Sequence, residues 1–344
     1  MKKTLIALAA LAATASFAQS SVTLFGVADL AYTYTKTGAA KTSSMTDSGL
    51  NSSRFGVRGE EDLGGGLKAG FWLEAGTNPD NGTGDATNTN NQAVAAFNTT
   101  TGANAPVRAG TQVLTFNRRS TLSLMGGFGE VRLGRDYTPH FWNHTVYDPF
   151  GTNGAGSSVA NNVNAEAGNL TGVRASNSIG YLSPSFNGLK VQVQTFLGEV
   201  ATPAAKAGNG NAIRVTYDNG PLSLAVGNGK TTTGAGTDWK ATNFGASYDL
   251  GVAKVMALSS TDKITGAADM KGSLVGATAP LGAGVAKIAF SNLKQGSTVD
   301  TDKTAIGYVY SLSKRTSLYT TYALTKPKTG DKTTGIDLGV SHSF

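Results

Sequence analysis

The chain has 344 residues, no Cys, 45 Gly, 9 Pro and a formal net charge of +7. Without Cys it forms no disulfide and has no thiolate metal site or Cys nucleophile. A glycine-rich chain with only 15% charged residues is also unlike an α-helical enzyme, which would be rich in Leu, Glu and Lys. No dense run of Lys and Arg accompanies the positive charge, so we expect no nucleic-acid partner.

The first 18 residues predict a secretory signal peptide. Lys2 and Lys3 precede an apolar stretch from Leu5 to Ala13, and Ala18 ends a small-residue cleavage motif. Such a leader is removed on export, so we divide the chain into a signal peptide (1-18) and one domain (19-344). Loss of the two lysines lowers the net charge from +7 to about +5.

Beyond residue 19 the sequence predicts β-strands. Apolar and polar residues alternate with a period of two along residues 67–74, 189–195 and 336–344, which is the pattern of strands with one apolar and one polar face. Segments of about ten residues suit tilted strands that cross a hydrocarbon layer.

The connections between these segments alternate between short and long. Seven are short and rich in Gly, at 63–66, 126–129, 184–188, 219–221, 249–251, 280–284 and 312–315. Eight are long, at about 38–50, 77–111, 138–172, 200–210, 230–238, 263–267, 295–302 and 326–334. Seven short and eight long connections separate sixteen strands.

This pattern predicts an all-β fold, a closed antiparallel 16-stranded transmembrane β-barrel. In lipid every backbone polar group needs an internal partner, and a sheet provides this only when it closes on itself. A soluble sandwich or propeller is the alternative. A sandwich would have more uniform loops, and the repeat of about 40 residues that marks a propeller is missing from the sequence.

Arginine is concentrated in one part of the chain. Of ten Arg residues, eight lie between 51 and 180, and an Arg that faced the lipid midplane would cost roughly 2–4 kcal/mol. The alternation of neighbouring apolar residues points five arginines into the lumen: Arg54, Arg58, Arg119, Arg132 and Arg174. It places Arg118 on the opposite face from these, near a strand end.

The long connection at 138–172 separates two of these strands and contains Asp148-Pro149-Phe150-Gly151. Connections of this length are usually functional. We expect this third long loop to fold into the lumen and narrow it; an ordinary solvated surface loop is the alternative.

Several segments together resemble the sixteen-stranded general porins of Gram-negative bacteria, and specifically the β-proteobacterial branch that includes anion-selective members. The matching segments are 21–26, Ser53–Leu67, Asn117–Ser120, Gly129–Arg135 and the terminal Phe344. The resemblance spans nearly the whole mature chain. It implies a water-filled channel in the cell outer membrane for passive diffusion of small hydrophilic solutes and anions.

The resemblance also implies site residues and partners. Arg54, Arg119 and Arg174, with Arg58 and Arg132 nearby, would form the pore constriction. The facing acids would be Glu74, which has lumen parity, and Asp148 on the inward loop. Phe344 would be read by the outer-membrane assembly machinery. The family is a homotrimer surrounded by outer-membrane lipid and lipopolysaccharide, and the resemblance implies no cofactor and no metal.

A barrel enzyme, a solute-specific channel and a surface receptor are the alternative functions. A barrel enzyme needs a nucleophile and a base, yet the mature chain has only His140, His144 and His342. The first two are spaced like a metal pair, but they lie in a loop without helical pattern or a nearby acidic cluster. A solute-specific channel, or an adhesin or receptor that acts through the Asn- and Thr-rich loop at 77–111, stays open beside the diffusion channel.

Overall fold

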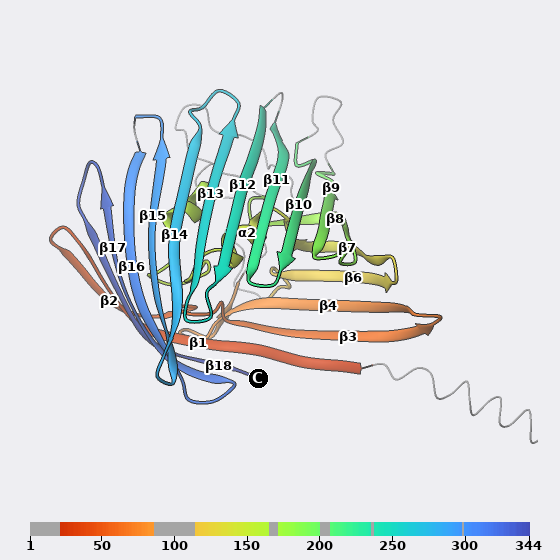
Figure 1. The fold of residues 1–344 in the computed structure, drawn as a ribbon, viewed down its shortest axis with the longest axis horizontal. Helices are drawn as coiled ribbons and strands as arrows, with labels where there is room; N and C mark the ends of the chain where they lie inside the picture. The colour runs from red at the N-terminus through yellow and green to blue at the C-terminus, as the bar shows by residue number, and fades with distance from the viewer. Residues whose placement is uncertain (1–20, 86–113, 165–170, 200–206, 235–236, 298) are drawn as a thin grey trace, which may run out of the picture.

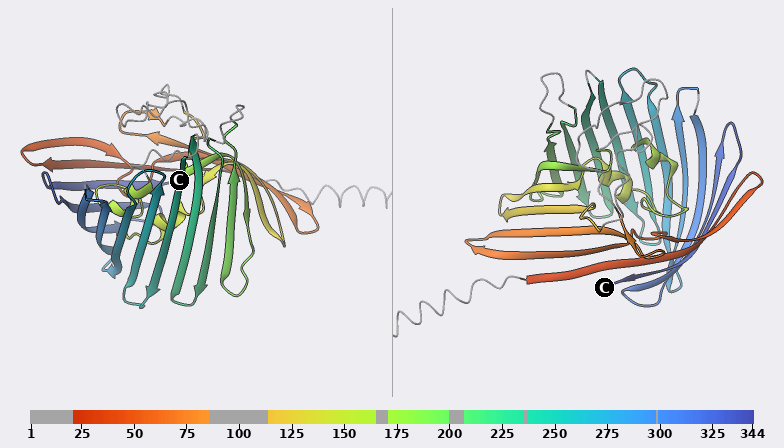
Figure 2. Two further views of the ribbon diagram at one scale, coloured as in Figure 1. Left: turned by 90° about the horizontal axis from the view of Figure 1, so that it is seen from above. Right: turned by 180° about the vertical axis from the view of Figure 1, so that it is seen from behind.

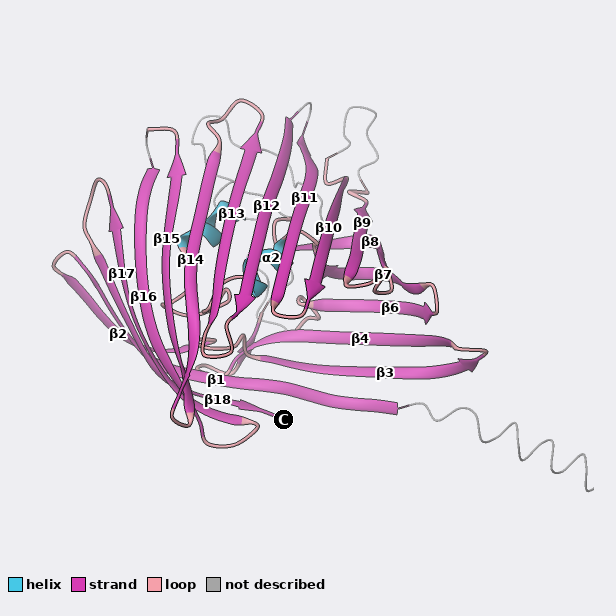
Figure 3. Cartoon of the chain, viewed as in Figure 1, coloured by secondary structure: helices cyan, strands magenta, loops and turns pink. Residues whose placement is uncertain are grey.

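The computed structural model describes residues 21–85, 114–164, 171–199, 207–234, 237–297 and 299–344. The signal peptide expected at 1-18 and most of the long loop at 77–111 lie outside these ranges. Nearly all of the described chain is strand (Figure 3). None of its described helices is long and apolar enough to cross a membrane.

Eighteen strands occur in the described residues, all joined in antiparallel order. In chain order they are β1 (Ser21–Thr37), β2 (Ala40–Asp47), β3 (Arg54–Gly64), β4 (Leu67–Asn78), β5 (Thr83–Gly84), β6 (Arg119–Gly126), β7 (Gly129–Tyr137), β8 (Arg174–Leu182), β9 (Leu189–Phe196), β10 (Gly210–Asn219), β11 (Leu222–Gly234), β12 (Thr237–Asp249), β13 (Lys254–Ile264), β14 (Met270–Leu281), β15 (Gly284–Gln295), β16 (Val299–Ser311), β17 (Thr316–Pro327) and β18 (Thr333–Ser343).

These strands occupy sixteen strand positions around a closed barrel, as the sequence predicts. We call each of these positions a stave. β2 and β3 pair with successive halves of β1 and together make one stave, and β5 is a two-residue strand in the loop after β4. β1 pairs with β18, and β9 pairs with β10, so the ring has no free edge. Figure 1 shows β3, β4, β6 and β7 running across the direction of β10 to β16.

Four of the expected long connections are shorter than predicted. The one at 295–302 is reduced to the three residues between β15 and β16, and the one at 326–334 to the five residues between β17 and β18. The segment 38–50 contains β2, which follows β1 through a two-residue turn at Gly38 and Ala39. At 230–238, β11 and β12 extend through most of the segment. These last two segments consist mostly of small and polar residues, and the barrel continues their strands beyond the apolar positions that carried the prediction.

The stave made of β2 and β3 is interrupted at residues 48–53 by a buried carboxylate. Asp29 is fully buried, and it accepts the backbone N–H groups of Gly49 and Asn51 at 3.0 and 2.8 Å. The hydroxyl of Tyr319 donates to the same carboxylate at 2.6 Å. These bonds satisfy backbone groups that leave the ladder at the break.

The outer face of the barrel is apolar. In β6, Leu122 and Leu124 are 60% and 41% exposed, whereas Thr121 and Ser123 between them are buried. A water-soluble protein places such residues the other way round. The exposed side chains therefore form the surface that contacts hydrocarbon.

Candidate functional site

The five arginines that the sequence places in the lumen lie on neighbouring staves. Arg54 and Arg58 are in β3, Arg119 is in β6, Arg132 in β7 and Arg174 in β8. We call the inner face of β1, β3, β4, β6, β7 and β8 the arginine wall. These staves follow one another around the ring.

One group of side chains on the arginine wall contacts Glu74. Its carboxylate accepts the Nε–H of Arg118 at 2.6 Å and lies 3.7 Å from Nη1 of Arg54. The indole Nε1–H of Trp72 donates to its other oxygen at 2.9 Å. Glu74 is buried, so these contacts are charge-assisted bonds shielded from water.

Arg118 belongs to this group, although alternation predicted the opposite face of the strand for it. β6 begins only at Arg119, so alternation along the strand does not govern the residue before it. The hydroxyl of Tyr137 accepts hydrogen bonds from Arg118 and from Arg174. The guanidinium of Arg174 also lies 4.1 Å from the centre of the Tyr137 ring.

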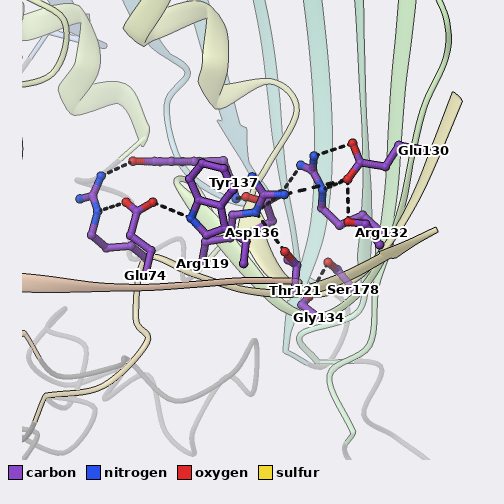
Figure 4. A network of polar contacts seen from close by, with 12 residues as sticks. Glu74, Arg119, Thr121, Glu130, Arg132, Gly134, Asp136, Tyr137 and Ser178 are labelled. Atoms are coloured by element: carbon purple, nitrogen blue, oxygen red, sulfur yellow. Dashed lines mark hydrogen bonds and ion pairs between the residues drawn. The ribbon is translucent and has the colours of Figure 1, made fainter. Parts of the chain in front are cut away.

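A second group lies around Glu130 and Asp136. Arg132 donates from Nε and Nη2 to the two oxygens of Glu130, both at 2.9 Å, and also pairs with Asp136. Arg119 donates to Thr121 at 3.0 Å and lies 3.7 Å from Asp136. Figure 4 shows these side chains together. Neither acid was predicted from the sequence. Glu130 could have been, because it lies two residues from Arg132 and therefore on the same face of the strand.

Arg58 differs from the other arginines. Among the described residues, no carboxylate lies within ion-pair distance of it. Its guanidinium lies 4.8 Å from the ring centre of Trp72 and 5.3 Å from that of Phe25. The side chain is exposed and lines a cavity of about 410 Å³ with Trp72, Arg119 and Arg132.

The charged groups just described on the arginine wall have a net positive charge. They comprise six guanidinium groups and three carboxylates. They are Arg54, Arg58, Arg118, Arg119, Arg132 and Arg174, with Glu74, Glu130 and Asp136. Guanidinium groups keep their charge in proteins, so this set of residues has three more positive than negative charges.

The connection between β7 and β8 packs against the wall opposite the arginine wall, which includes β11 and β12. It contains α2 (Phe141–Val146) and η1 (Val159–Asn164), which lie within the ring of strands (Figure 2). Asn143 hydrogen-bonds Asn243 of β12 at 2.7 Å. Tyr147 is fully buried and bonds Ser223 of β11 at 2.9 Å.

Glycines of the opposite wall allow this close approach. A Cβ on Gly245 would lie 2.1 Å from the ring of Tyr147, and one on Gly276 would lie 2.6 Å from Pro149. Any larger residue at these positions would push the connection away from the wall. No pattern in the sequence distinguishes these glycines from the others.

Asp148 does not face the arginines, contrary to our expectation. It is buried and accepts the N–H groups of Phe150 and Ser158 at 2.9 and 3.2 Å. Burial raises the pKa of Asp148 to about 6, although these bonds act against the shift. The acid of this motif therefore stabilises the fold of its own loop, because the residue before Pro149 points back onto the following turn.

Three further cations lie near this connection. Arg214 of β10 donates to Asn143 at 2.7 Å, and Lys303 of β16 donates to the carbonyl of Ser157 at 2.6 Å. Lys287 of β15 lies 5.7 Å from the Phe150 ring. None of the three was predicted from the sequence, because they are spread over the lysine-rich half of the chain.

His140 directly precedes α2 and His144 lies in it, and both are buried. His140 lies 5.7 Å from Trp239 between ring centres, and Nδ1 of His144 lies 3.1 Å from the amide oxygen of Asn161. Burial lowers their pKa values to about 3 and about 4. The described residues hold no group of three or more potential metal ligands.

Phe344 closes the seam between the two ends of the chain. Its backbone exchanges two hydrogen bonds with Gly26, both at 3.1 Å. Its ring lies where a side chain on Gly26 would be, because a Cβ there would be 2.2 Å from the ring. The ring is 47% exposed.

Comparison with known proteins gives consistent matches. A family model described as Gram-negative porin matches residues 4–330. Outer membrane porin protein 32 of Delftia acidovorans is 38% identical, with all of both chains covered. An outer membrane porin protein of Bordetella pertussis is 29% identical over the same full coverage.

Solved structures match over most of the chain as well. A structure described as an anion-selective porin from Comamonas acidovorans superposes with a TM-score of 0.80 at 34% identity, covering 95% of this chain and 100% of the other. OmpF of Salmonella typhi, in complex with daunomycin, has a TM-score of 0.67 at 15% identity over 94% and 97% of the chains. The latter shows the fold alone.

Proposed function

This chain belongs to the Gram-negative porin family and is a channel of the outer membrane, and we propose that its pore favours small anions over cations. The observation that carries this proposal is the excess of three positive charges among the six arginines and three acids that contact one another on the arginine wall. Fixed cations in a narrow, low-dielectric passage raise the local concentration of anions. The related porin from Comamonas acidovorans is described as anion-selective.

The acids of the arginine wall fit this function. Glu74 lies between Arg54 and Arg118, and Asp136 lies between Arg119 and Arg132. They keep like charges from repelling one another. They also limit how strongly an anion binds, and conduction requires binding that is weak enough for release.

We propose that the connection between β7 and β8 narrows the pore. Its helices lie inside the ring and its apolar side chains pack on the far wall. The remaining passage would run between this connection and the arginine wall. The constriction would then be lined by Arg54, Arg119 and Arg174, with Arg58, Arg132 and Glu74 beside them.

Reversal potentials in a salt gradient test the proposal. Purified protein in a planar bilayer between unequal KCl solutions should form open pores and give a potential of the sign expected for chloride preference. The variant R54Q/R119Q/R174Q should lose most of that preference. A control that removes three exposed charges, one at the start of β2 and two in the turn before β17, K41Q/K314Q/R315Q, should keep it. Cation preference in the wild type, or equal behaviour of the two triple variants, would refute the proposal.

We also propose a homotrimer in outer-membrane lipid and lipopolysaccharide, inserted by the outer-membrane assembly machinery. The apolar outer face supports burial in lipid or against another copy. Light scattering of the detergent-solubilised protein would show a mass of three chains. A monomeric mass at all protein concentrations would contradict the trimer.

We propose no catalytic role. The relatives are porins, and the two buried histidines have no carboxylate bonded to them in the described residues. A purified sample that hydrolysed ester or peptide substrates faster than the buffer, and lost this activity in H140Q, would overturn this part of the proposal.

A further inference from the structure

Trp72 occupies a central position on the arginine wall. In β4 it is paired with Arg58 of β3 on one side and with Thr121 of β6 on the other. The guanidinium carbons of Arg58 and Arg119 lie 4.8 and 4.5 Å from the centre of its ring. One uncharged side chain therefore contacts a cation from each neighbouring stave.

These contacts hold two cations without adding a negative charge, and Arg58 has no other charged partner among the described residues, whereas Arg119 also lies 3.7 Å from Asp136. A guanidinium over the face of an indole is attracted by the ring quadrupole. Unlike a carboxylate, the ring adds no negative charge. Phe25 supports the arrangement, because its ring meets that of Trp72 edge to face at 5.0 Å and also lies near Arg58.

Arg119 already lies 4.0 Å from Glu130, and an acid within the same cavity could also pair with Arg58 if the ring did not hold it. Glu60 and Glu130 line the cavity together with Arg58, Arg119 and Trp72. Glu60 is exposed and lies 3.6 Å from Lys68. A long arginine side chain in water samples many rotamers, so Arg58 released from the ring would be free to pair with Glu60.

Trp72 also connects the two charged groups of the arginine wall. Its Nε1–H donates to Glu74, the carboxylate shared by Arg54 and Arg118. The indole N–H thus orients Glu74, while the indole ring contacts Arg58 and Arg119. Removing it would alter both groups and leave the formal charge of the chain unchanged.

We propose that Trp72 is a positioning residue for ion selectivity: it holds Arg58 and Arg119 at the lumen surface and prevents Arg58 from pairing with a nearby carboxylate. This inference rests on the proposed anion preference. It assigns part of that preference to a neutral side chain, so charge alone does not account for selectivity. An indole that only filled space would be replaceable by any apolar residue of similar size.

The test compares W72L and W72F with a control in the same cavity, M125A. W72L should lower the chloride-to-potassium permeability ratio by roughly threefold, and the loss should be largest at low salt because the effect is electrostatic. W72F keeps an aromatic face and should restore most of the ratio. M125A enlarges the cavity without removing a ring and should keep the wild-type ratio.

A chemical measurement separates this inference from the proposed function. Phenylglyoxal modifies guanidinium groups, and mass spectrometry locates the modified residues. Arg58 and Arg119 should react several-fold faster in W72L than in the wild type, with no increase in M125A. Thermal unfolding followed by circular dichroism confirms that each variant is a folded barrel.

The outcomes are distinguishable. If the wild type prefers anions and folded W72L has the same permeability ratio, the inference is wrong. It is also wrong if M125A loses as much selectivity as W72L, or if W72L leaves the reactivity of both arginines unchanged. If the wild type shows no anion preference, the proposed function fails, and faster modification in W72L still supports the positioning role.

Discussion

Arg118 donates a hydrogen bond from Nε to a carboxylate oxygen of Glu74 at 2.6 Å, and both side chains are buried. The same oxygen lies 3.7 Å from Arg54. One acid thus lies between two cations in the wall of a pore. Its negative charge lowers the anion preference and keeps the two guanidinium groups in place, so its removal has opposite effects on selectivity and stability.

The first prediction is that E74Q increases anion preference and decreases stability. Loss of the carboxylate adds one net positive charge to the arginine wall, so the chloride-to-potassium permeability ratio should rise. The two guanidinium groups would repel each other, and the free energy of unfolding should fall by roughly 1–3 kcal/mol. Reversal potentials and thermal unfolding measure the two effects.

The matched control is E60Q. Glu60 is exposed and pairs only loosely with Lys68, and exposed pairs contribute little to stability. This variant makes the same change in formal charge and should leave the unfolding temperature unchanged. A decrease in anion preference in E74Q would contradict the role given to Glu74.

The sequence predicted the barrel and five of the arginines because both depend on alternation. Strands that separate lipid from water must alternate in polarity, so Arg119 and Arg132 could be placed in the lumen by counting from exposed leucines. The same rule failed at Arg118, which precedes the first paired residue of β6. Alternation applies only within a strand, and the ends of strands are set by contacts that a sequence pattern does not contain.

The loop was harder to predict than the strands. Its position inside the barrel depends on side-chain partners far away in the chain, such as Ser223 for Tyr147 and Asn243 for Asn143. Asp148 was assigned to the constriction from its place in a motif. Its bonds to Phe150 and Ser158 are local, and turn chemistry of this kind competes with any outward role of an Asp side chain.

The second prediction concerns the glycines beneath the loop. G245L should push Tyr147 away from β12, because a Cβ at Gly245 would already lie 2.1 Å from its ring. The loop has room to move only toward the lumen, so the single-channel conductance should fall. G127A is the control, since no atom lies within 4 Å of a Cβ at that position. An unchanged conductance in G245L would show that the loop does not narrow the pore.

The third prediction is that acid loosens the loop. The pKa values of His140 and His144 are lowered by burial to about 3 and about 4. The folded state therefore binds fewer protons than the unfolded loop between about pH 4 and the ordinary histidine pKa of about 6.5. The stability of the docked loop should fall as the pH drops through this window, by roughly 1.4 kcal/mol per pH unit for each histidine.

Asp148 opposes this effect. Burial raises its pKa to about 6, so the folded loop binds more protons than the unfolded loop between about pH 4 and pH 6, and this term favours the docked loop as the pH falls. Two histidines outweigh one carboxyl group, and the net effect of acid is loosening.

Hydrogen–deuterium exchange of residues 138–164 checks the third prediction. After correction for the intrinsic exchange rate, protection should be lower at pH 4.5 than at pH 7. H140Q/H144Q should remove most of this difference, whereas H342Q should not, because His342 is exposed. Greater protection at pH 4.5 in the wild type would contradict the argument.

The fourth prediction separates two roles of Phe344. Its backbone bonds to Gly26 close the seam between β1 and the end of the chain, while its ring remains 47% exposed. If the ring is an assembly signal, F344A should reduce the amount of folded barrel in the outer membrane. The same variant should refold in detergent with nearly the wild-type yield, because the alanine keeps both backbone bonds.

Deletion of residue 344 provides the comparison. It removes the two bonds to Gly26 along with the ring, so it should impair refolding in detergent as well as insertion in cells. The yield of folded barrel in each setting can be measured by protease resistance. If F344A refolds as poorly in detergent as the deletion does, the ring acts in closing the barrel, and a separate signal is not needed to explain a loss in cells.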